Sequence, residues 1–262
     1  LDWLKENRYN RKVYAGSSAA PWKITGQNNW WDWAIGTPEK LITTLMMIKD
    51  TLTQEQINEY LAFFNEQVPV PRMSGANYTD MAYEVIGSAL LRNDAERILD
   101  VQAMITQTFL YADDNRRFAE SVLDAARQAY TPIKGAGFFT DGSYILHTLH
   151  PHNYSYGTVQ FSAYADFISV FAGTNFEMKI PFIDNVYDIF KNSFDAAVYD
   201  GKVFRWTLGR GPSQDANDYY GVHAFLFRIT SAFDEETKND IRRILKKEGK
   251  EHGEAIIRKL PL

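Results

Sequence analysis

The stretch TPEKLITTLMMIKDTLTQEQINEYLAFF, residues 37–64, decides the fold class because it carries the signals of two helices joined by a short turn. Thr37 is expected to cap the first helix, and Pro38 suits its first position. Thr53 and Gln56 form a capping-box pattern that opens the second helix. Two helices linked this closely are expected to form an antiparallel hairpin.

Most of the chain outside a few loops repeats this helical pattern. Further helices are expected at about 78–92, 94–110, 115–129, 156–173, 183–198, 216–231 and 234–248. The loops between them are rich in Gly, Pro and Asn and lie at 65–77, 130–157 and 201–215. Short extended pieces are expected on either side of the Asp141-Gly142 turn, at 137–139 and 143–146. The pattern predicts an all-α fold, an incomplete α/α toroid built of antiparallel helical hairpins, with an irregular helical bundle as the alternative.

Composition sets wide limits on function. A chain of 262 residues allows one large domain or two small ones, and a single domain over 1–262 is expected. Cysteine is absent, which excludes disulfides, thiol nucleophiles and cysteine-bound metals. The net charge of −5 argues against a nucleic-acid binder, and an enzyme acting on a polyanion would need a local basic cleft. The amphipathic, charged start at Leu1–Lys5 is expected of a mature or trimmed exported chain.

Loops and helix starts carry an amide, an imidazole, a phenol and a guanidinium, at Asn77, His147, Tyr156 and Arg210. Their ordinary alternatives are a helix cap, a half-buried imidazole, a core aromatic ring and a surface arginine. Glycines on both sides of Arg210 let the backbone approach a ligand and free the guanidinium to point inward. Such a set suits the removal of a proton next to a carboxylate.

Trp30, Trp31 and Trp33 fall within four residues of each other. Indole faces stack on the C–H faces of pyranose rings and bury a large area at little entropic cost. Three indoles this close together cannot all point into one core. We therefore expect at least one to line a sugar-binding cleft, against the alternative that they are simply core residues.

Two other chemistries are open on sequence grounds. His150 and His152 share a face of an extended segment, as metal ligands would, but no acid or cysteine is near, so no metal is expected. A glycosidase pair of carboxylates would draw on Asp32 or Asp141, although the Asp-Gly turn is a sufficient explanation for Asp141.

Asp80 and Glu84 are the other acids near these motifs. They stand four residues apart in an expected helix. Such spacing predicts an ordinary exposed helix face.

Taken in order, these segments resemble polysaccharide lyase family 8, the hyaluronate, chondroitin and xanthan lyases. The residues that carry the resemblance lie between about 28 and 214 and are Asn29-Trp30-Trp31-Asp32-Trp33, Ile35-Gly36-Thr37-Pro38, Gly75-Ala76-Asn77, Gly137-Phe138-Phe139-Thr140-Asp141-Gly142-Ser143, His147, Tyr156-Gly157 and Gly209-Arg210. In that family an α/α toroid is followed by large β-sandwich domains. The resemblance therefore implies that this chain is a portion of a longer lyase.

The implied activity is that of a carbon–oxygen lyase that cleaves a uronic-acid polysaccharide by β-elimination, with no cofactor and no metal. Asn77 and His147 would neutralise the substrate carboxylate, and Tyr156, near Arg210, would act as base and then acid. In an alternative assignment His147 is the base and Tyr156 only the acid. The substrate-binding residues would be Asn29, Trp30, Trp31, Trp33, Tyr154 and Gln214. The expected partner is an acidic polysaccharide, with no nucleic acid and no membrane, for a monomeric, secreted or periplasmic bacterial protein.

The chain departs from the family pattern at three positions. Ala34 stands where the family has Glu, and Tyr78 where it has Arg after the catalytic Asn. Gln214 replaces a second Arg. Neutral residues at Tyr78 and Gln214 predict fewer sulfate or carboxylate contacts than the family makes.

Three rival functions remain. A toroid glycoside hydrolase would release reducing sugar without an unsaturated product. A non-catalytic glycan-binding module would keep the tryptophans and tolerate the loss of Tyr156. A plain helical scaffold would leave the segment 147–156 and the tryptophan cluster unexplained.

Overall fold

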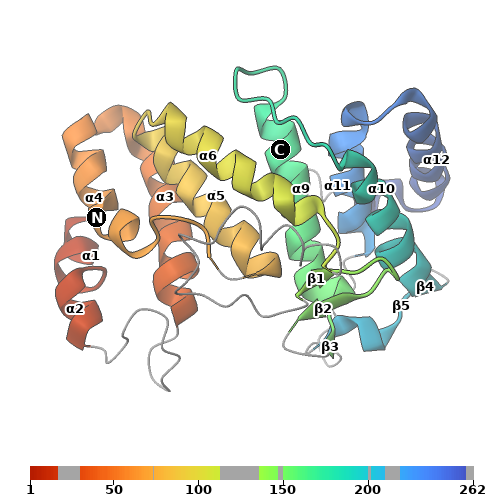
Figure 1. Ribbon diagram of the computed structural model, residues 1–262, viewed down its shortest axis with the longest axis horizontal. Helices are drawn as coiled ribbons and strands as arrows, with labels where there is room; N and C mark the ends of the chain where they lie inside the picture. Colours follow the sequence, from red (N-terminus) through yellow and green to blue (C-terminus); the bar gives the residue numbers. More distant parts are fainter. Residues whose placement is uncertain are drawn as a thin grey trace. The chain divides into compact units, whose positions relative to one another are not determined.

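The computed structural model describes residues 1–16, 30–72, 74–112, 136–146, 150–199, 202–209 and 219–257, and it is predominantly helical (Figure 1). The chain divides into two compact units, Leu1–Arg72 with Asn77–Ala103, and Met73–Ala76 with Met104–Leu262. The single domain expected over 1–262 stays a prediction. The helix expected at 115–129 lies outside the described residues.

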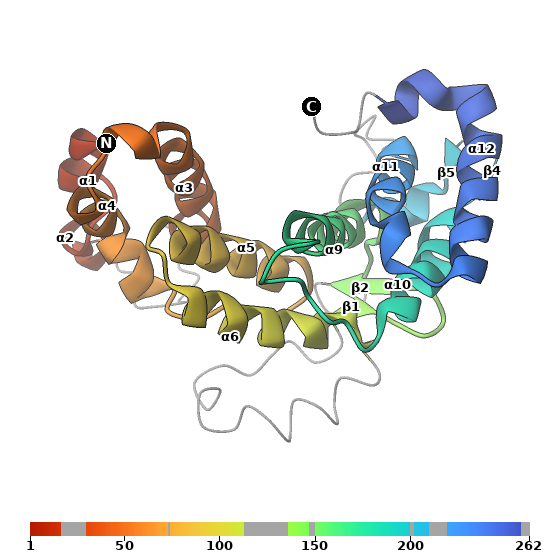
Figure 2. The ribbon, with the colours of Figure 1, turned by 90° about the horizontal axis from the view of Figure 1, so that it is seen from above.

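The first unit is built from paired helices. They are α1 (Asp2–Asn7), α2 (Arg11–Gly16), α3 (Thr37–Ile48), α4 (Gln54–Gln67), α5 (Gly75–Leu91) from Asn77 onward, and α6 (Ala95–Thr106) up to Ala103. α3 and α4 pack against each other, and α5 and α6 run side by side (Figures 1 and 2). The expected hairpin of residues 37–64 is confirmed.

The start of α3 differs from the expectation. The chain is already helical before Thr37, because a π-helical turn over Asp32–Gly36 leads into α3, and the Thr37 N–H donates to the Asp32 carbonyl. Thr37 therefore makes no side-chain cap, and its predicted capping role is wrong. Pro38 lacks an N–H and crowds the preceding turn, and a widened π turn accommodates this.

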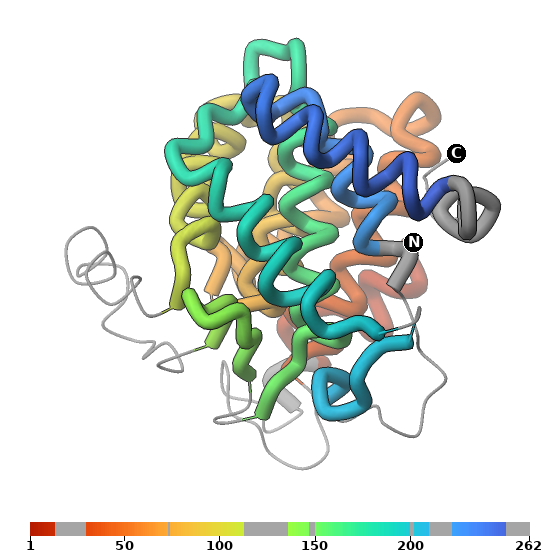
Figure 3. Tube along the Cα trace, turned by 90° about the vertical axis from the view of Figure 1, so that its right-hand side faces the viewer, coloured from red at the N-terminus to blue at the C-terminus, as the bar shows by residue number. Residues whose placement is uncertain are grey.

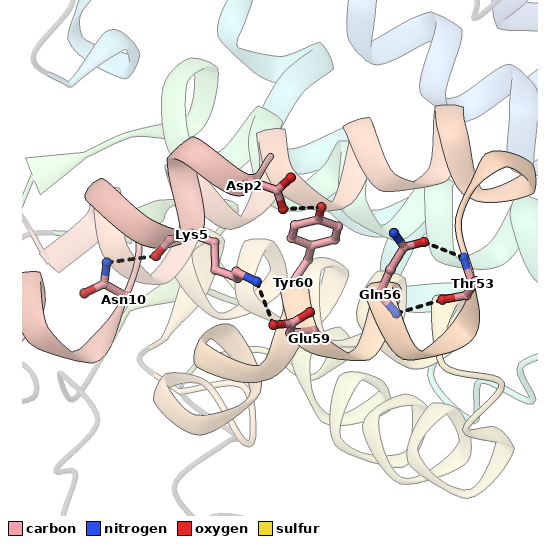
Figure 4. A network of polar contacts seen from close by, with 7 residues as sticks. All are labelled: Asp2, Lys5, Asn10, Thr53, Gln56, Glu59 and Tyr60. Carbon is pink, nitrogen blue, oxygen red and sulfur yellow. Dashed lines mark hydrogen bonds and ion pairs between the residues drawn. The ribbon is translucent and has the colours of Figure 1, made fainter.

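The capping box that opens α4 is confirmed. The Gln56 N–H donates to Thr53 Oγ1 at 3.2 Å, and the Thr53 N–H donates to Gln56 Oε1 at 2.9 Å (Figure 4). α1 is tied to α4 by the Lys5–Glu59 ion pair at 2.6 Å and by the hydrogen bond from Tyr60 to Asp2 at 2.7 Å. These exposed contacts add little, so the buried apolar residues dominate the packing of α3 and α4. The main ones are Leu41, Leu45, Ile57, Leu61 and Phe64.

The second unit combines helices with two small sheets. Its described elements are β1 (Gly137–Phe138), β2 (Tyr144–Leu146), β3 (His150–Pro151), α9 (Thr158–Phe171), α10 (Ile183–Ile189), β4 (Val198–Tyr199), β5 (Lys202–Val203), α11 (Tyr219–Ile229) and α12 (Glu235–Ile257). The antiparallel pairing of β1 with β2 around Asp141-Gly142 confirms the expected extended pieces. The strands β3, β4 and β5 fall where the sequence predicted a loop or a helix end.

Helices enclose an aromatic core in this unit. α11 packs between α9 and α12 (Figures 2 and 3). Phe138, Tyr144, Phe161, Phe190 and Phe194 have at most 2% of their surface exposed. The high aromatic content thus serves the core in large part. Among the described helices, none is long and apolar enough to cross a membrane.

Candidate functional site

The segment Asn153–Gly157 is held to Gly142 and Tyr144 by buried polar bonds. Asn153 is 2% exposed, and its amide donates to the carbonyls of Gly142 at 2.8 Å and Ser193 at 3.0 Å. Its Oδ1 accepts the Tyr144 N–H at 3.1 Å. With three bonds, Asn153 fixes the turn that follows it, a role the sequence did not reveal.

Tyr144 connects this segment to the start of α5 and to α9. Its hydroxyl accepts the Ala76 N–H at 2.9 Å and donates to Gln160 Oε1 at 3.0 Å. Gly75 has a φ of +58°, and a Cβ there would lie 2.6 Å from that hydroxyl. Only glycine therefore fits directly before Ala76. The hydrogen bond from Ala76 to Tyr144 holds the start of α5, and Asn77 is the next residue.

Tyr156 lies in a π-helical turn, Asn153–Gly157, which leads into α9. Its ring is half-buried and meets the His152 ring edge to face, with centroids 5.1 Å apart. His152 is 1% exposed, and its Nδ1 lies 2.9 Å from Ser155 Oγ. The buried His152 imidazole therefore packs against the Tyr156 phenol, which was expected to transfer the proton.

The same imidazole also contacts the segment that precedes Arg210. Gly209 has a φ of +58°, and a Cβ added to it would lie 1.8 Å from His152 Nδ1. Gly209 is thus required both by its backbone conformation and by its close packing on His152. One ring brings the Tyr156 turn and the Gly209 segment together. His152 was considered only as a metal ligand, and nothing in the sequence signalled this role.

Four of the expected site residues lie outside the described residues. They are Asn29, His147, Arg210 and Gln214. Asn77 is half-buried in the first turn of α5.

The three tryptophans separate into different environments. Trp31 is 37% exposed and Trp30 is half-buried, so both keep accessible surface. Trp33 is 9% exposed, stacks on Tyr9 with centroids 5.8 Å apart, and meets Phe63 edge to face. The expected sugar contact of Trp33 is therefore not supported, because its ring is buried and packs on other aromatic rings.

Tyr154 also requires a correction. Its side chain is 4% exposed, its hydroxyl donates to the Phe194 carbonyl at 3.0 Å, and its ring meets that of Phe194. A ring enclosed in this way offers no face to a sugar. We assign Tyr154 to the core rather than to substrate binding.

The acids on α5 differ most from expectation. Glu84 is 3% exposed and Asp80 is half-buried, so the predicted exposed helix face is wrong. Burial, with the nearby Glu39 charge, raises the pKa of Asp80 to about 7 and that of Glu84 to about 8. Within the described residues neither carboxyl has a hydrogen bond or an ion pair.

The acids weighed for a hydrolase have ordinary surroundings. Asp32 is exposed. Asp141 accepts the Ser143 hydroxyl at 2.7 Å and its N–H at 2.9 Å, and these bonds lower the pKa of Asp141. A general acid needs a raised pKa, so Asp141 is a turn residue. His150 is exposed while His152 is buried, so the two rings do not form the shared face of a metal site.

Similarity to known proteins identifies the class as a helical domain of carbohydrate-degrading lyases. The family described as polysaccharide lyase family 8, N terminal alpha-helical domain, matches residues 14–133 and 120–247. The chain belongs to this family.

Curated relatives are similar over most of the chain. A polysaccharide lyase 8 family protein, HylA of Enterococcus faecalis, is 29% identical over 80% of this chain and 14% of its own length. A hyaluronate lyase of Staphylococcus aureus is 25% identical over 94% of this chain and 31% of its own length. A xanthan lyase of a Bacillus species is 23% identical over 87% of this chain and 22% of its own length. The chain therefore spans less than a third of these relatives.

Solved structures share the fold. The Paenibacillus xanthan lyase superposes with a TM-score of 0.69 at 24% identity, over 92% of this chain and 21% of that one. A variant of the Streptomyces coelicolor chondroitin AC lyase gives 0.68 at 19% identity, over 95% of this chain and 34% of that one. The expected fold class, all-α with an incomplete α/α toroid of helical hairpins, is confirmed.

Proposed function

We propose that this chain is part of the catalytic helical portion of a lyase that cleaves a uronic-acid polysaccharide by β-elimination. Membership of polysaccharide lyase family 8 supports the reaction class. The relatives named hyaluronate lyase and xanthan lyase support an acidic polysaccharide as the substrate. The single observation that carries the proposal is that His152 contacts both the Tyr156 ring and Gly209, which adjoins Arg210.

The proposed reaction begins with removal of the C5 proton of a uronate, which water does only slowly. The C5–H of a uronate is weakly acidic because removing its proton adds negative charge next to a carboxylate. In the proposal, Asn77 and His147 bind that carboxylate and stabilise the enolate-like intermediate. Loss of the C5 proton becomes feasible once this charge is spread.

Tyr156 moves the proton in the proposed reaction. In the proposal Arg210 assists Tyr156, whose phenolate takes the C5 proton. The C4–O bond then breaks, its electron pair leaves with the glycosidic oxygen, and the phenol returns the proton to that oxygen. The product carries a C4–C5 double bond, and no water is consumed. In the alternative assignment, His147 takes the proton and Tyr156 donates one to the leaving oxygen.

An ultraviolet assay tests this proposal. Wild type and Tyr156→Phe are incubated with hyaluronan, chondroitin, dermatan and xanthan, and the unsaturated-uronate chromophore is followed. We expect growth of the chromophore for wild type only, with equal helix content by circular dichroism. Near-full activity of Tyr156→Phe would remove the phenol from the mechanism.

The rival functions give different results in the same samples. New reducing ends without the chromophore would indicate a hydrolase. Retained glycan binding without any cleavage would indicate a binding module.

We also propose that the protein is secreted or periplasmic in a bacterium and acts as a monomer. Light scattering and fractionation of cultures test these two points.

A further inference from the structure

Three aromatic side chains of the second unit are exposed around the β4–β5 hairpin. Tyr199 is 76% exposed, Trp206 is 62% exposed and Phe204 is 42% exposed. The Phe204 and Trp206 rings are nearly parallel, with an interplanar angle of 16° and centroids 6.4 Å apart. Large rings exposed side by side leave apolar area in water, which is unfavourable unless a ligand covers it.

Two cations alternate with these rings. Lys202 and Arg205 are both exposed. Within the described part of the chain, neither forms an ion pair or a side-chain hydrogen bond. In sequence, the nearest lysine with an ion pair is Lys191, which is bound to Asp195 at 3.0 Å. The run Lys202–Trp206 is thus locally basic on a chain of net charge −5.

Buried anchors hold this run in one conformation. Val203, Thr207 and Leu208 are at most 7% exposed. The Phe204 N–H donates to the Ala197 carbonyl at 2.9 Å, and Thr207 Oγ1 donates to the Phe204 carbonyl at 2.6 Å. Because the backbone is fixed, binding of a ligand orders side chains only and does not have to order the backbone as well.

We propose that Lys202, Phe204, Arg205 and Trp206 form a binding subsite for an acidic polysaccharide. The rings would take the C–H faces of pyranose units, and the cations would take their carboxylate or sulfate groups. Charge complementarity selects this occupant, since a purely apolar partner would leave two cations unpaired and a neutral glycan would not use them. Two residues separate Trp206 from Gly209, so the subsite precedes the segment packed on His152.

The identity of the ligand rests on the proposed function. The site itself goes beyond that function, because neither Phe204 nor Trp206 belongs to the expected tryptophan cluster or to the reaction. A polysaccharide bound here would contact residues that take no part in the proposed reaction. The subsite therefore affects affinity for long chains more than the chemical step.

Binding of size-defined hyaluronan and chondroitin oligosaccharides, measured by calorimetry, tests the subsite. Trp206→Ala and Phe204→Ala are each expected to weaken binding roughly five- to tenfold. Arg205→Gln should weaken binding at low salt and make it less dependent on salt. Trp206→Phe should restore most of the affinity. Circular dichroism of each variant checks that these replacements at exposed positions leave the fold intact.

Two matched controls are available in the first unit. Trp3 is 69% exposed and Arg92 is exposed. Trp3→Ala and Arg92→Gln remove the same residue types from the surface and should bind like wild type. For Trp206→Ala, KM is expected to rise for long chains, whereas Trp3→Ala should keep the wild-type KM.

Failure of the subsite and failure of the proposed function give different results. If wild type binds or cleaves a polyanion and the Trp206 and Arg205 variants match Trp3→Ala, the subsite is overturned while the proposed function stands. If wild type neither binds nor cleaves any acidic polysaccharide, the proposed function is overturned. The ligand assigned to the subsite is then overturned as well. A concentration-dependent dimer that Trp206→Ala abolishes would assign the rings to a second copy of the chain and overturn the subsite.

Discussion

Two regions of the molecule bury polar side chains in opposite ways. The segment Asn153–Gly157 of the second unit buries Asn153 with three hydrogen bonds. The α5 helix of the first unit buries Glu84 and half-buries Asp80, with no hydrogen bond to either carboxyl among the described residues. A satisfied buried amide fixes a structure, whereas an unsatisfied buried carboxyl takes up a proton.

This difference explains why the carboxyl groups with strongly raised pKa values lie on α5. The pKa values of Asp80 and Glu84 are raised to about 7 and about 8 by burial, first of all. Around Tyr156, by contrast, local order comes from a hydrogen bond and from close packing at His152. Stability should therefore depend on pH mainly through the α5 acids, and on mutation mainly through the Asn153 segment.

Asn153→Ala should have the largest effect on stability. It leaves the carbonyls of Gly142 and Ser193 and the Tyr144 N–H without their partner. We expect a loss of about 4 kcal/mol in the free energy of unfolding, with activity lost alongside. Denaturant melts measure it, with Asn185→Ala as the control that removes one bond, to the Phe109 carbonyl. Equal losses for the two variants would contradict the assigned role of Asn153.

Gly209→Ala should come next. The new methyl would occupy the place of the buried His152 ring, and the φ of +58° is unfavourable for alanine. We expect a loss of about 3 kcal/mol from strain and overpacking together. Gly173→Ala is the matched control, since Gly173 has a φ of +70° but nothing within 4 Å of an added Cβ. If the control loses as much as Gly209→Ala, the packing on His152 is unimportant.

Glu84→Gln should change how stability varies with pH. The folded protein keeps the Glu84 proton up to a pKa of about 8, while the unfolded chain releases it near 4.5. Between these values the folded state binds more protons, so wild-type stability falls as pH rises. An amide removes the Glu84 share of that slope, while Asp80 keeps its own, and we expect the variant to exceed wild type by about 2 kcal/mol at pH 9.

Chemical denaturation at pH 5, 7 and 9 measures this effect. The exposed Glu55 on α4 gives the control Glu55→Gln, whose hydrated carboxyl leaves the profile like that of wild type. Parallel profiles for wild type and Glu84→Gln would show that Glu84 is ionised in the folded protein.

Local signals allowed much of the fold to be predicted. The capping box, the α3–α4 hairpin and the strands flanking Asp141-Gly142 depend on residues close in sequence, and all are confirmed. The start of α3 was misread, because the helical turn before Thr37 removes the free N–H groups that a cap would serve. A cap signal is thus conditional on what precedes it.

The surroundings of the site could not be read in the same way. His152 contacts Gly209 across more than fifty residues, and Asn153 reaches Ser193 across 40. Tyr154 and Trp33 have the residue types of a sugar platform, yet tertiary packing buries both. Spacing also cannot show that the helix face of Glu84 is covered. Burial is set by distant segments, so residue type alone does not separate a core ring from a binding ring.

Thr53→Ala gives the smallest expected effect and isolates burial as the cause of the larger ones. Thr53 and Gln56 satisfy each other fully, as Asn153 does its partners, but both are exposed. Water can replace their bonds, so we expect a loss of only about 1 kcal/mol in thermal or denaturant melts. Thr43→Ala, exposed within α3, is the control and should leave stability unchanged or slightly raised, since alanine favours helix. A loss as large as that of Asn153→Ala would mean that the number of hydrogen bonds, rather than their burial, sets the cost.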